Sequence, residues 1–223
     1  MSAKPPTSRN SSPPAELPAL WPWLLAGVAG SGLLALWFPL WPHVGRVPPA
    51  DLRTFAPTLL AGLLYALVLL ALHAFYLTAI GRVNRTGATL PAVLLGGLLL
   101  GLPLLLAYPI NATDIYRYLI RGRVAAVYGQ SPFVAPPAAF IGDPFLPLAG
   151  EWAGETSPYG PLWELVATGV AAVSGDNLLL GVVLFKLLAL GCLLGGAAII
   201  WAAVGERPGR VVAADSSLIE ARP

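Results

Sequence analysis

Charged residues are scarce in this chain, and their scarcity limits what the protein can be. Only 11% of its 223 residues are Asp, Glu, Lys or Arg, whereas 57% are hydrophobic, and the mean hydropathy is +0.73. Soluble domains carry roughly 25% charged residues. The composition therefore excludes an ordinary soluble enzyme and predicts an integral membrane protein.

Cysteine and the common cofactor motifs are missing as well. The one cysteine, Cys192, permits no internal disulfide, and the sequence contains no P-loop, GxGxxG, Ser-His-Asp arrangement or metal-ligand cluster. A net charge of +2 is too small to indicate a nucleic-acid partner. We therefore expect no nucleic-acid binding and assign no cofactor. A divalent metal remains an alternative, because Glu151 and Glu155 are loop carboxylates of the kind that bind one.

What the chain has instead is a series of apolar runs. A membrane-spanning helix needs about 20 predominantly apolar residues. The fourth run is short and carries Glu164, and the fifth contains Lys186, so we expect four to five spans in an all-α polytopic membrane bundle. The runs cover residues 17–41, 54–81, 86–113, 161–174 and 178–204.

These runs divide the chain into five segments. Arg82 and Arg85, after the second run, favour the cytoplasm under the positive-inside rule, which predicts a multi-pass protein of the cell membrane with its N-terminus inside. The predicted segments are a disordered cytoplasmic tail (1–17), three transmembrane helices (18–108), an extracytoplasmic loop (109–160), one or two further spans (161–204) and a polar tail (205–223).

A polar island interrupts the apolar pattern at residues 111–133, NATDIYRYLIRGRVAAVYGQSPF. At about 100° per residue its first part forms a short amphipathic helix. Asp114, Arg117 and Arg121 then share one face, and Arg123 points roughly opposite to Asp114. We expect this helix, over about 113–128, to lie in the membrane interface. After Gly129 the many prolines predict a stiff, irregular outer loop.

Asp114 is the sharpest catalytic candidate in the island. A carboxylate at the mouth of a membrane bundle can act as a general base towards an acceptor hydroxyl. The alternative is that it only stabilises the start of a helix, by roughly 0.3–1 kcal/mol.

The arginines and tyrosines nearby suit a sugar phosphate. Guanidinium groups match phosphate oxygens, and tyrosine rings can stack on a sugar; the alternatives are snorkelling to lipid head groups and anchoring at the interface. The candidate phosphate ligands are Arg117, Arg121 and Arg123, and the candidate pocket residues are Tyr116, Tyr118 and Tyr159.

The stretch TDIYRYLIRGRVAAVYGQSPFVAPP, followed by SPYGPLW, resembles bacterial polytopic mannosyltransferases of the GT-C class. It is most similar to the polyprenyl-phosphate-mannose-dependent α-1,6-mannosyltransferases and their relatives in glycosyltransferase family 87. The resemblance covers roughly residues 90–204. It rests on Asp114, Tyr116, Tyr118, Gly122, residues 129–133 and residues 157–162.

The resemblance implies an inverting sugar transfer from a polyprenyl phosphate to a glycan or glycolipid hydroxyl on the outer face, amid membrane lipid, with Asp114 as the base. Members of that class are usually much longer and have many more spans. We therefore expect this chain to be an N-terminal portion, with a further segment or a second chain supplying the missing spans.

Two other functions remain open at the level of the sequence. One is a non-catalytic membrane subunit that binds a polyprenyl lipid or a partner chain. The other is a transporter or flippase, which charged residues inside spans would support; Lys186 and, if charged, His73 are of this kind. An Asp114→Asn change separates an enzyme from a binding subunit, because only the enzyme would lose turnover.

Overall fold

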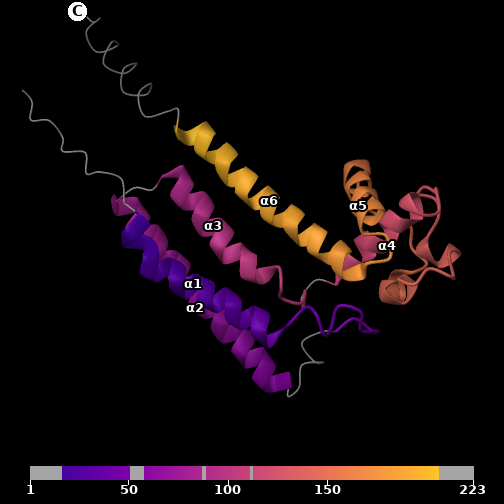
Figure 1. Cartoon of the computed structure of the whole chain (residues 1–223), viewed down its shortest axis with the longest axis horizontal. Coiled ribbons are helices and arrows are strands. Elements are labelled where there is room, and N and C mark those ends of the chain that lie inside the picture. The colour runs from indigo at the N-terminus through magenta and orange to yellow at the C-terminus, as the bar shows by residue number, and fades with distance from the viewer. Residues whose placement is uncertain (1–16, 51–57, 87–88, 111–112, 206–223) are drawn as a thin grey trace, which may run out of the picture.

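The computed structural model describes residues 17–50, 58–86, 89–110 and 113–205, so the predicted tails lie almost wholly outside it. Within these ranges the chain is helical and has no β-strand (Figure 1), which confirms the all-α prediction for this part of the protein. The α-helices are α1 (Leu17–Trp37), α2 (Thr58–Thr86), α3 (Leu90–Leu104), α4 (Asp114–Ala126), α5 (Pro161–Ser174) and α6 (Leu178–Gly205).

Among the residues that the structure describes, two helices are long and apolar enough to cross a membrane. They are Gly62–Gly81 within α2 and Leu178–Val204 within α6. Helices α3 and α5 have 15 and 14 residues, and at 1.5 Å per residue they fall short of a hydrocarbon core of about 30 Å. The apolar runs therefore do form helices, whereas a total of four to five spans stays a prediction.

The boundary of α2 differs from the sequence interpretation. The second loop was expected to begin at Gly81, but α2 continues to Thr86. Arg82 and Arg85 therefore belong to its last turns, because no proline or other helix breaker follows Gly81 directly. Their side chains lie outside the described residues.

The apolar helices pack through small residues. α3 lies between α1 and α6 and contacts both (Figure 1). A Cβ atom on Gly101 of α3 would stand 2.5 Å from Leu190 Cδ1 of α6. Glycine at this contact makes room for the Leu190 side chain against the backbone of α3, and small residues are common where helices pack within membranes.

Lys186 joins α6 to the end of α3. Its Nζ donates to the Leu104 carbonyl at 2.8 Å and to the Ala107 carbonyl. The last carbonyls of a helix have no partner within the helix, and a cation there also opposes the helix dipole. Lys186 thus caps α3, a role that sequence reasoning did not assign to it.

The part of the structure at the N-terminal end of α6, named the outer part for its distance from α1 and α2, is built on α4. This helix packs against α5, the base of α6 and the 3-10 helices η2 (Pro137–Ala139) and η3 (Leu146–Trp152), and Figure 1 shows these elements gathered at one end of α6. Between Gly129 and Gly160 the only helices are η2 and η3, so the predicted irregular Pro-rich loop is confirmed. The buried side chains at this end include Tyr116, Leu119, Ile120, Phe145, Leu148, Val182 and Phe185.

Gly122 sets the distance between α4 and α5. A Cβ atom there would stand 2.2 Å from the carbonyl oxygen of Ala167 and 2.5 Å from its carbonyl carbon. Because these atoms belong to the backbone of α5, no side-chain rotation can relieve the overlap. Only glycine fits where the two helices touch.

Arg123, in the last turn of α4, ties three segments together. Its Nε donates to Asp143 Oδ2 of the outer loop at 2.8 Å. Its Nη1 donates to the Gly175 carbonyl at 2.6 Å, and its Nη2 lies 2.9 Å from Asp176 Oδ1 between α5 and α6. Burial lowers the pKa of the guanidinium, but the hydrogen bonds and charges of the two carboxylates outweigh burial and raise it overall.

We predict that Gly122→Ala destabilises the outer part of the chain. Alanine normally favours a helix interior by about 1 kcal/mol over glycine, whereas forced overpacking costs about 1–3 kcal/mol. The clash should outweigh the usual stabilising effect of alanine in a helix, so the Tm of the detergent-solubilised protein should fall. Gly169→Ala, inside α5, is the matched control, since nothing lies within 4 Å of its Cβ position. A Tm for Gly122→Ala equal to the wild-type value would contradict the packing.

We also predict unequal effects for the two carboxylates that contact Arg123. Asp143→Ala leaves a buried guanidinium short of its buried partner and should cost roughly 3–5 kcal/mol of unfolding free energy. Asp176→Ala should cost about 1 kcal/mol or less, because 82% of the Asp176 side chain is exposed. Urea unfolding of both variants measures this, and equal losses would show that the burial of Asp143 is not what matters.

Candidate active site

The predicted island helix is present as α4, which has 13 residues and begins at Asp114. At 1.5 Å per residue it is about 20 Å long, too short to span a membrane. Tyr116 and all of residues 119–124 are buried, so protein neighbours surround the second half of the helix on every side. A position along the membrane interface stays a prediction.

Asp114 and Arg117 form an open ion pair at the start of α4. Arg117 Nη1 donates to Asp114 Oδ1 at 2.7 Å, and 40% of the Asp114 side chain is exposed. The Arg117 guanidinium also lies over the ring of Trp152 in η3, 4.7 Å from its centroid. The carboxylate is therefore accessible, and its orientation is fixed by a cation that the outer loop holds in place.

Arg121 lies one turn further along α4 and is almost completely buried, with 2% of its surface exposed. Its guanidinium carbon lies 5.7 Å from the centroid of the Tyr159 ring, which comes from the turn before α5. Its Nε has no hydrogen-bond partner among the described residues. The structure thus supplies a buried cation with unused donor capacity.

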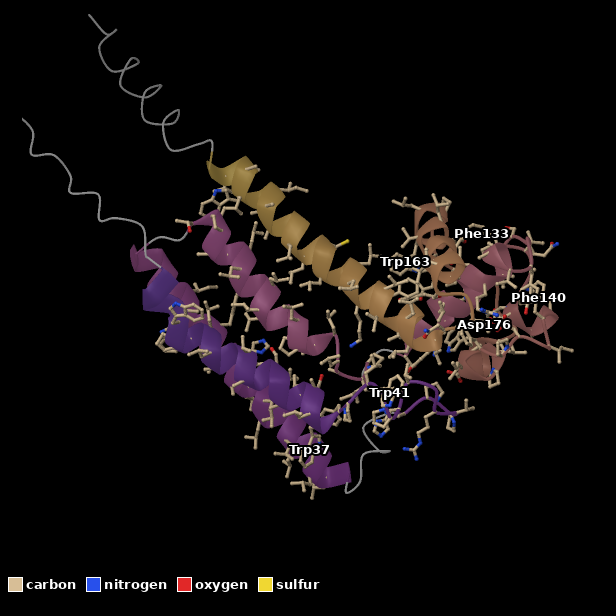
Figure 2. The ribbon with its side chains drawn as sticks, in the orientation of Figure 1. Trp37, Trp41, Phe133, Phe140, Trp163 and Asp176 are labelled. Atoms are coloured by element: carbon tan, nitrogen blue, oxygen red, sulfur yellow. The ribbon has the colours of Figure 1, made fainter. Side chains whose placement is uncertain are left out.

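Tyr118 and Tyr159 are brought together beside Arg121. Their rings meet edge to face at 5.1 Å, and Trp163 of α5 meets Tyr118 in the same way at 4.9 Å. Figure 2 shows Trp163 at the end of the molecule that α4 and α5 form. Burial and then the interaction with Tyr159 raise the pKa of the Tyr118 hydroxyl to about 12. This hydroxyl therefore stays protonated at neutral pH and can donate a hydrogen bond.

Two predicted site residues lie elsewhere. Tyr116 is 1% exposed and packs beside Tyr108 in the core. It lies two residues after Asp114, and residues two apart on a helix point to roughly opposite sides. Burial, followed by the interaction with Tyr108, raises the pKa of the Tyr116 hydroxyl. Arg123 is engaged by Asp143 and its other partners, away from Asp114. A substrate role for either residue stays a prediction.

Sequence reasoning missed Ser157 and Glu164. The Ser157 hydroxyl donates to Glu164 Oε1 and accepts a hydrogen bond from the Tyr159 amide at 3.1 Å. Glu164, in the first turn of α5, is 4% exposed. The available signal was an acidic residue inside an apolar run, which is costly unless it has a partner or a function.

A metal site was left open by the sequence. Among the described residues no group of three or more His, Cys, Asp or Glu side chains is placed to hold a metal ion. Glu151 accepts a hydrogen bond from the neighbouring Trp152 indole at 3.1 Å. The side chains that meet around Asp114 and Arg121 are guanidinium groups and aromatic rings.

Comparison with known proteins gives one family and several relatives. The N-terminal domain of the family described as alpha-(1->6)-mannopyranosyltransferase matches residues 24–210. Alpha-(1->6)-mannopyranosyltransferase A of Corynebacterium glutamicum is 35% identical over 88 residues, 40% of this chain and 18% of that protein. Alpha-(1->6)-mannopyranosyltransferase A of Mycobacterium tuberculosis is 36% identical over 104 residues, 45% of this chain and 19% of that protein.

The match thus covers less than a fifth of the length of each of these relatives. No solved structure matches the chain. The family match, in contrast, extends over most of the described residues, from α1 through the outer part to α6. The chain therefore belongs to the alpha-(1->6)-mannopyranosyltransferase family, and it corresponds to the family's N-terminal domain.

Proposed function

We propose that the chain is the catalytic N-terminal part of a membrane mannosyltransferase that moves mannose from a polyprenyl-phosphate donor to a hydroxyl of an extracytoplasmic glycan or glycolipid. The observation that carries this proposal is the open Asp114–Arg117 ion pair at the start of α4, one turn from the buried Arg121. A carboxylate and two guanidinium groups thus lie along one helix in a member of a mannosyltransferase family, with Arg121 one turn beyond Arg117 and two turns beyond Asp114. This arrangement supports a base and a phosphate-binding group in one site.

Asp114 is the base in this reaction. It removes the proton of the acceptor hydroxyl while that oxygen attacks the anomeric carbon of mannose. The bond between the anomeric carbon and the phosphate oxygen breaks, and the polyprenyl phosphate leaves with the electron pair. Because attack and departure occur on opposite faces of the sugar, the anomeric configuration inverts.

Arg121 and Arg117 bind the departing phosphate. A guanidinium offers a planar fork of donors that suits phosphate oxygens. Arg121 has a donor without a partner among the described residues, and its fixed, buried position means that no reorganisation is needed as negative charge builds up on the phosphate. Arg117 divides its donors between Asp114 and the entering substrate.

The pocket formed by the apolar helices favours a second candidate, a lipid-binding subunit without catalysis. A cavity of ≈ 420 Å³ lies among α1, α2, α3 and α6. Its wall is almost entirely apolar and includes Trp23, Leu72, Phe75, Leu100 and Leu193. Such a wall fits a polyprenyl tail, or a helix from the remainder of a longer enzyme or from a partner chain. Turnover that depends on Asp114 decides between the two candidates.

We expect Asp114→Asn to abolish transfer while leaving donor binding intact. Asparagine keeps the size of the side chain but cannot take a proton, and loss of a general base lowers the rate by roughly 10²–10⁴-fold. Mannose transfer and binding of the polyprenyl donor would be measured in the full-length enzyme. Asp176→Asn, at an exposed carboxylate far along the chain, is the control. If Asp114→Asn transferred mannose at the wild-type rate, Asp114 would not be the base.

We expect position 114 to face the outside of the cell. In a Cys192→Ser background, a cysteine at position 114 should react with an impermeant thiol reagent in intact cells, because the basic residues that end α2 favour the cytoplasm one helix earlier. An Arg85→Cys variant is the matched control and should react only after permeabilisation. Labelling of position 114 that also requires permeabilisation would overturn this topology.

A further inference from the structure

Unpartnered polar atoms gather at the corner between α4 and α5. Arg121 Nε, Trp163 Nε1 and Glu164 Oε2 are buried and have no hydrogen-bond partner among the described residues. Buried polar groups in folded proteins nearly always have a partner. Two donors and one acceptor left open at one corner therefore point to a polar group that enters there.

The Glu164 carboxylate is oriented from one side only. Its Oε1 accepts the hydrogen bond of Ser157, whose hydroxyl is itself fixed by the Tyr159 amide at 3.1 Å. Ser157 is held in turn, because its amide donates to the Pro132 carbonyl at 2.8 Å. One oxygen of the carboxylate is thus used for positioning, and Oε2 is left to accept a hydrogen bond from something else.

The surroundings of this oxygen indicate the class of ligand. Arg121 is not within ion-pair distance of Glu164, since the structure records no salt bridge between them within 4.0 Å. A phosphate would be repelled by the carboxylate, whereas a hydroxyl can donate to it. The rings of Tyr118, Tyr159 and Trp163 meet one another, and Trp163 directly precedes Glu164 in the first turn of α5. Aromatic faces offer an apolar surface to the C–H face of a sugar ring.

We propose that Glu164, oriented by Ser157, recognises the transferred sugar by accepting a hydrogen bond from one of its hydroxyl groups, while the linked phosphate lies at Arg121. The inference rests on the proposed function and adds the residue that selects the sugar. The Tyr159 ring lies over the Arg121 guanidinium, so it has to move aside when the donor enters.

The test measures donor selectivity. Binding of a short-chain polyprenyl-phosphate mannose, and of analogues that each lack one sugar hydroxyl, would be measured on the full-length enzyme in detergent. The wild type should bind one of these deoxy donors roughly 10–100-fold more weakly, as expected for a lost hydrogen bond to a charged group. Glu164→Leu should bind the parent donor more weakly by a similar factor, and it should no longer discriminate against that one analogue.

Two further variants distinguish recognition from a structural role. Ser157→Ala keeps the Glu164 carboxylate but removes the hydrogen bond that orients it. This variant should discriminate against the same analogue less strongly than the wild type does. Asp176→Leu, at an exposed acid of the turn between α5 and α6, should keep wild-type selectivity. Thermal unfolding of each variant would confirm that it is folded.

Several results would overturn the inference. Equal weakening of all donors in Glu164→Leu would mean that the residue only supports the corner, for example through a buried water. If the wild type binds every deoxy donor as tightly as the parent donor, no sugar hydroxyl is recognised by a hydrogen bond. If the wild type binds neither polyprenyl-phosphate mannose nor polyprenyl phosphate, the proposed function itself fails, and the inference fails with it.

Discussion

The close approach of α4 to α5 at Gly122 is the constraint on which the outer part of the molecule depends. The missing side chain lets the α4 backbone meet the Ala167 carbonyl of α5, and this contact sets the positions of the residues on either side. Arg121 therefore lies against the ring of Tyr159, and Arg123 lies within reach of Asp143 and of the turn between α5 and α6. One of the two arginines is thereby left with open donors, and the other anchors the loop that covers the corner.

The chain combines an apolar part that suits a bilayer with a polar part at one end of α6. Lys186 links the two, because it reaches from α6 to the carbonyls at the end of α3, just before the chain turns towards α4. This arrangement keeps α4, which begins at Asp114, at one end of the apolar helices (Figure 1). A lipid-linked phosphate needs such a layout, because its tail has to stay among apolar side chains while its sugar reaches polar ones.

The sequence predicted what depends on local pattern and missed what depends on packing. Apolar runs predicted the long helices, the 3.6-residue period predicted α4, and proline density predicted the irregular loop. The pairing of Arg123 with Asp143, of Lys186 with Leu104 and of Ser157 with Glu164 could not be read from the sequence. Each of these contacts arises only when separate elements meet. The helical period placed Arg121 on the same face as Asp114, but its burial depends on the turn that folds Tyr159 over it.

The central claim is that the corner of α4 and α5 holds the sugar-phosphate end of a polyprenyl-phosphate mannose donor. The most direct measurement is a cryo-EM structure of the full-length enzyme with a non-reactive analogue of that donor. The account predicts phosphate oxygens at hydrogen-bond distance, about 3 Å, from Arg121, with the anomeric carbon of the sugar facing the side from which Asp114 can reach an acceptor hydroxyl. A donor bound with its phosphate away from α4, and with the corner of Arg121 and Glu164 still closed by Tyr159, would contradict it.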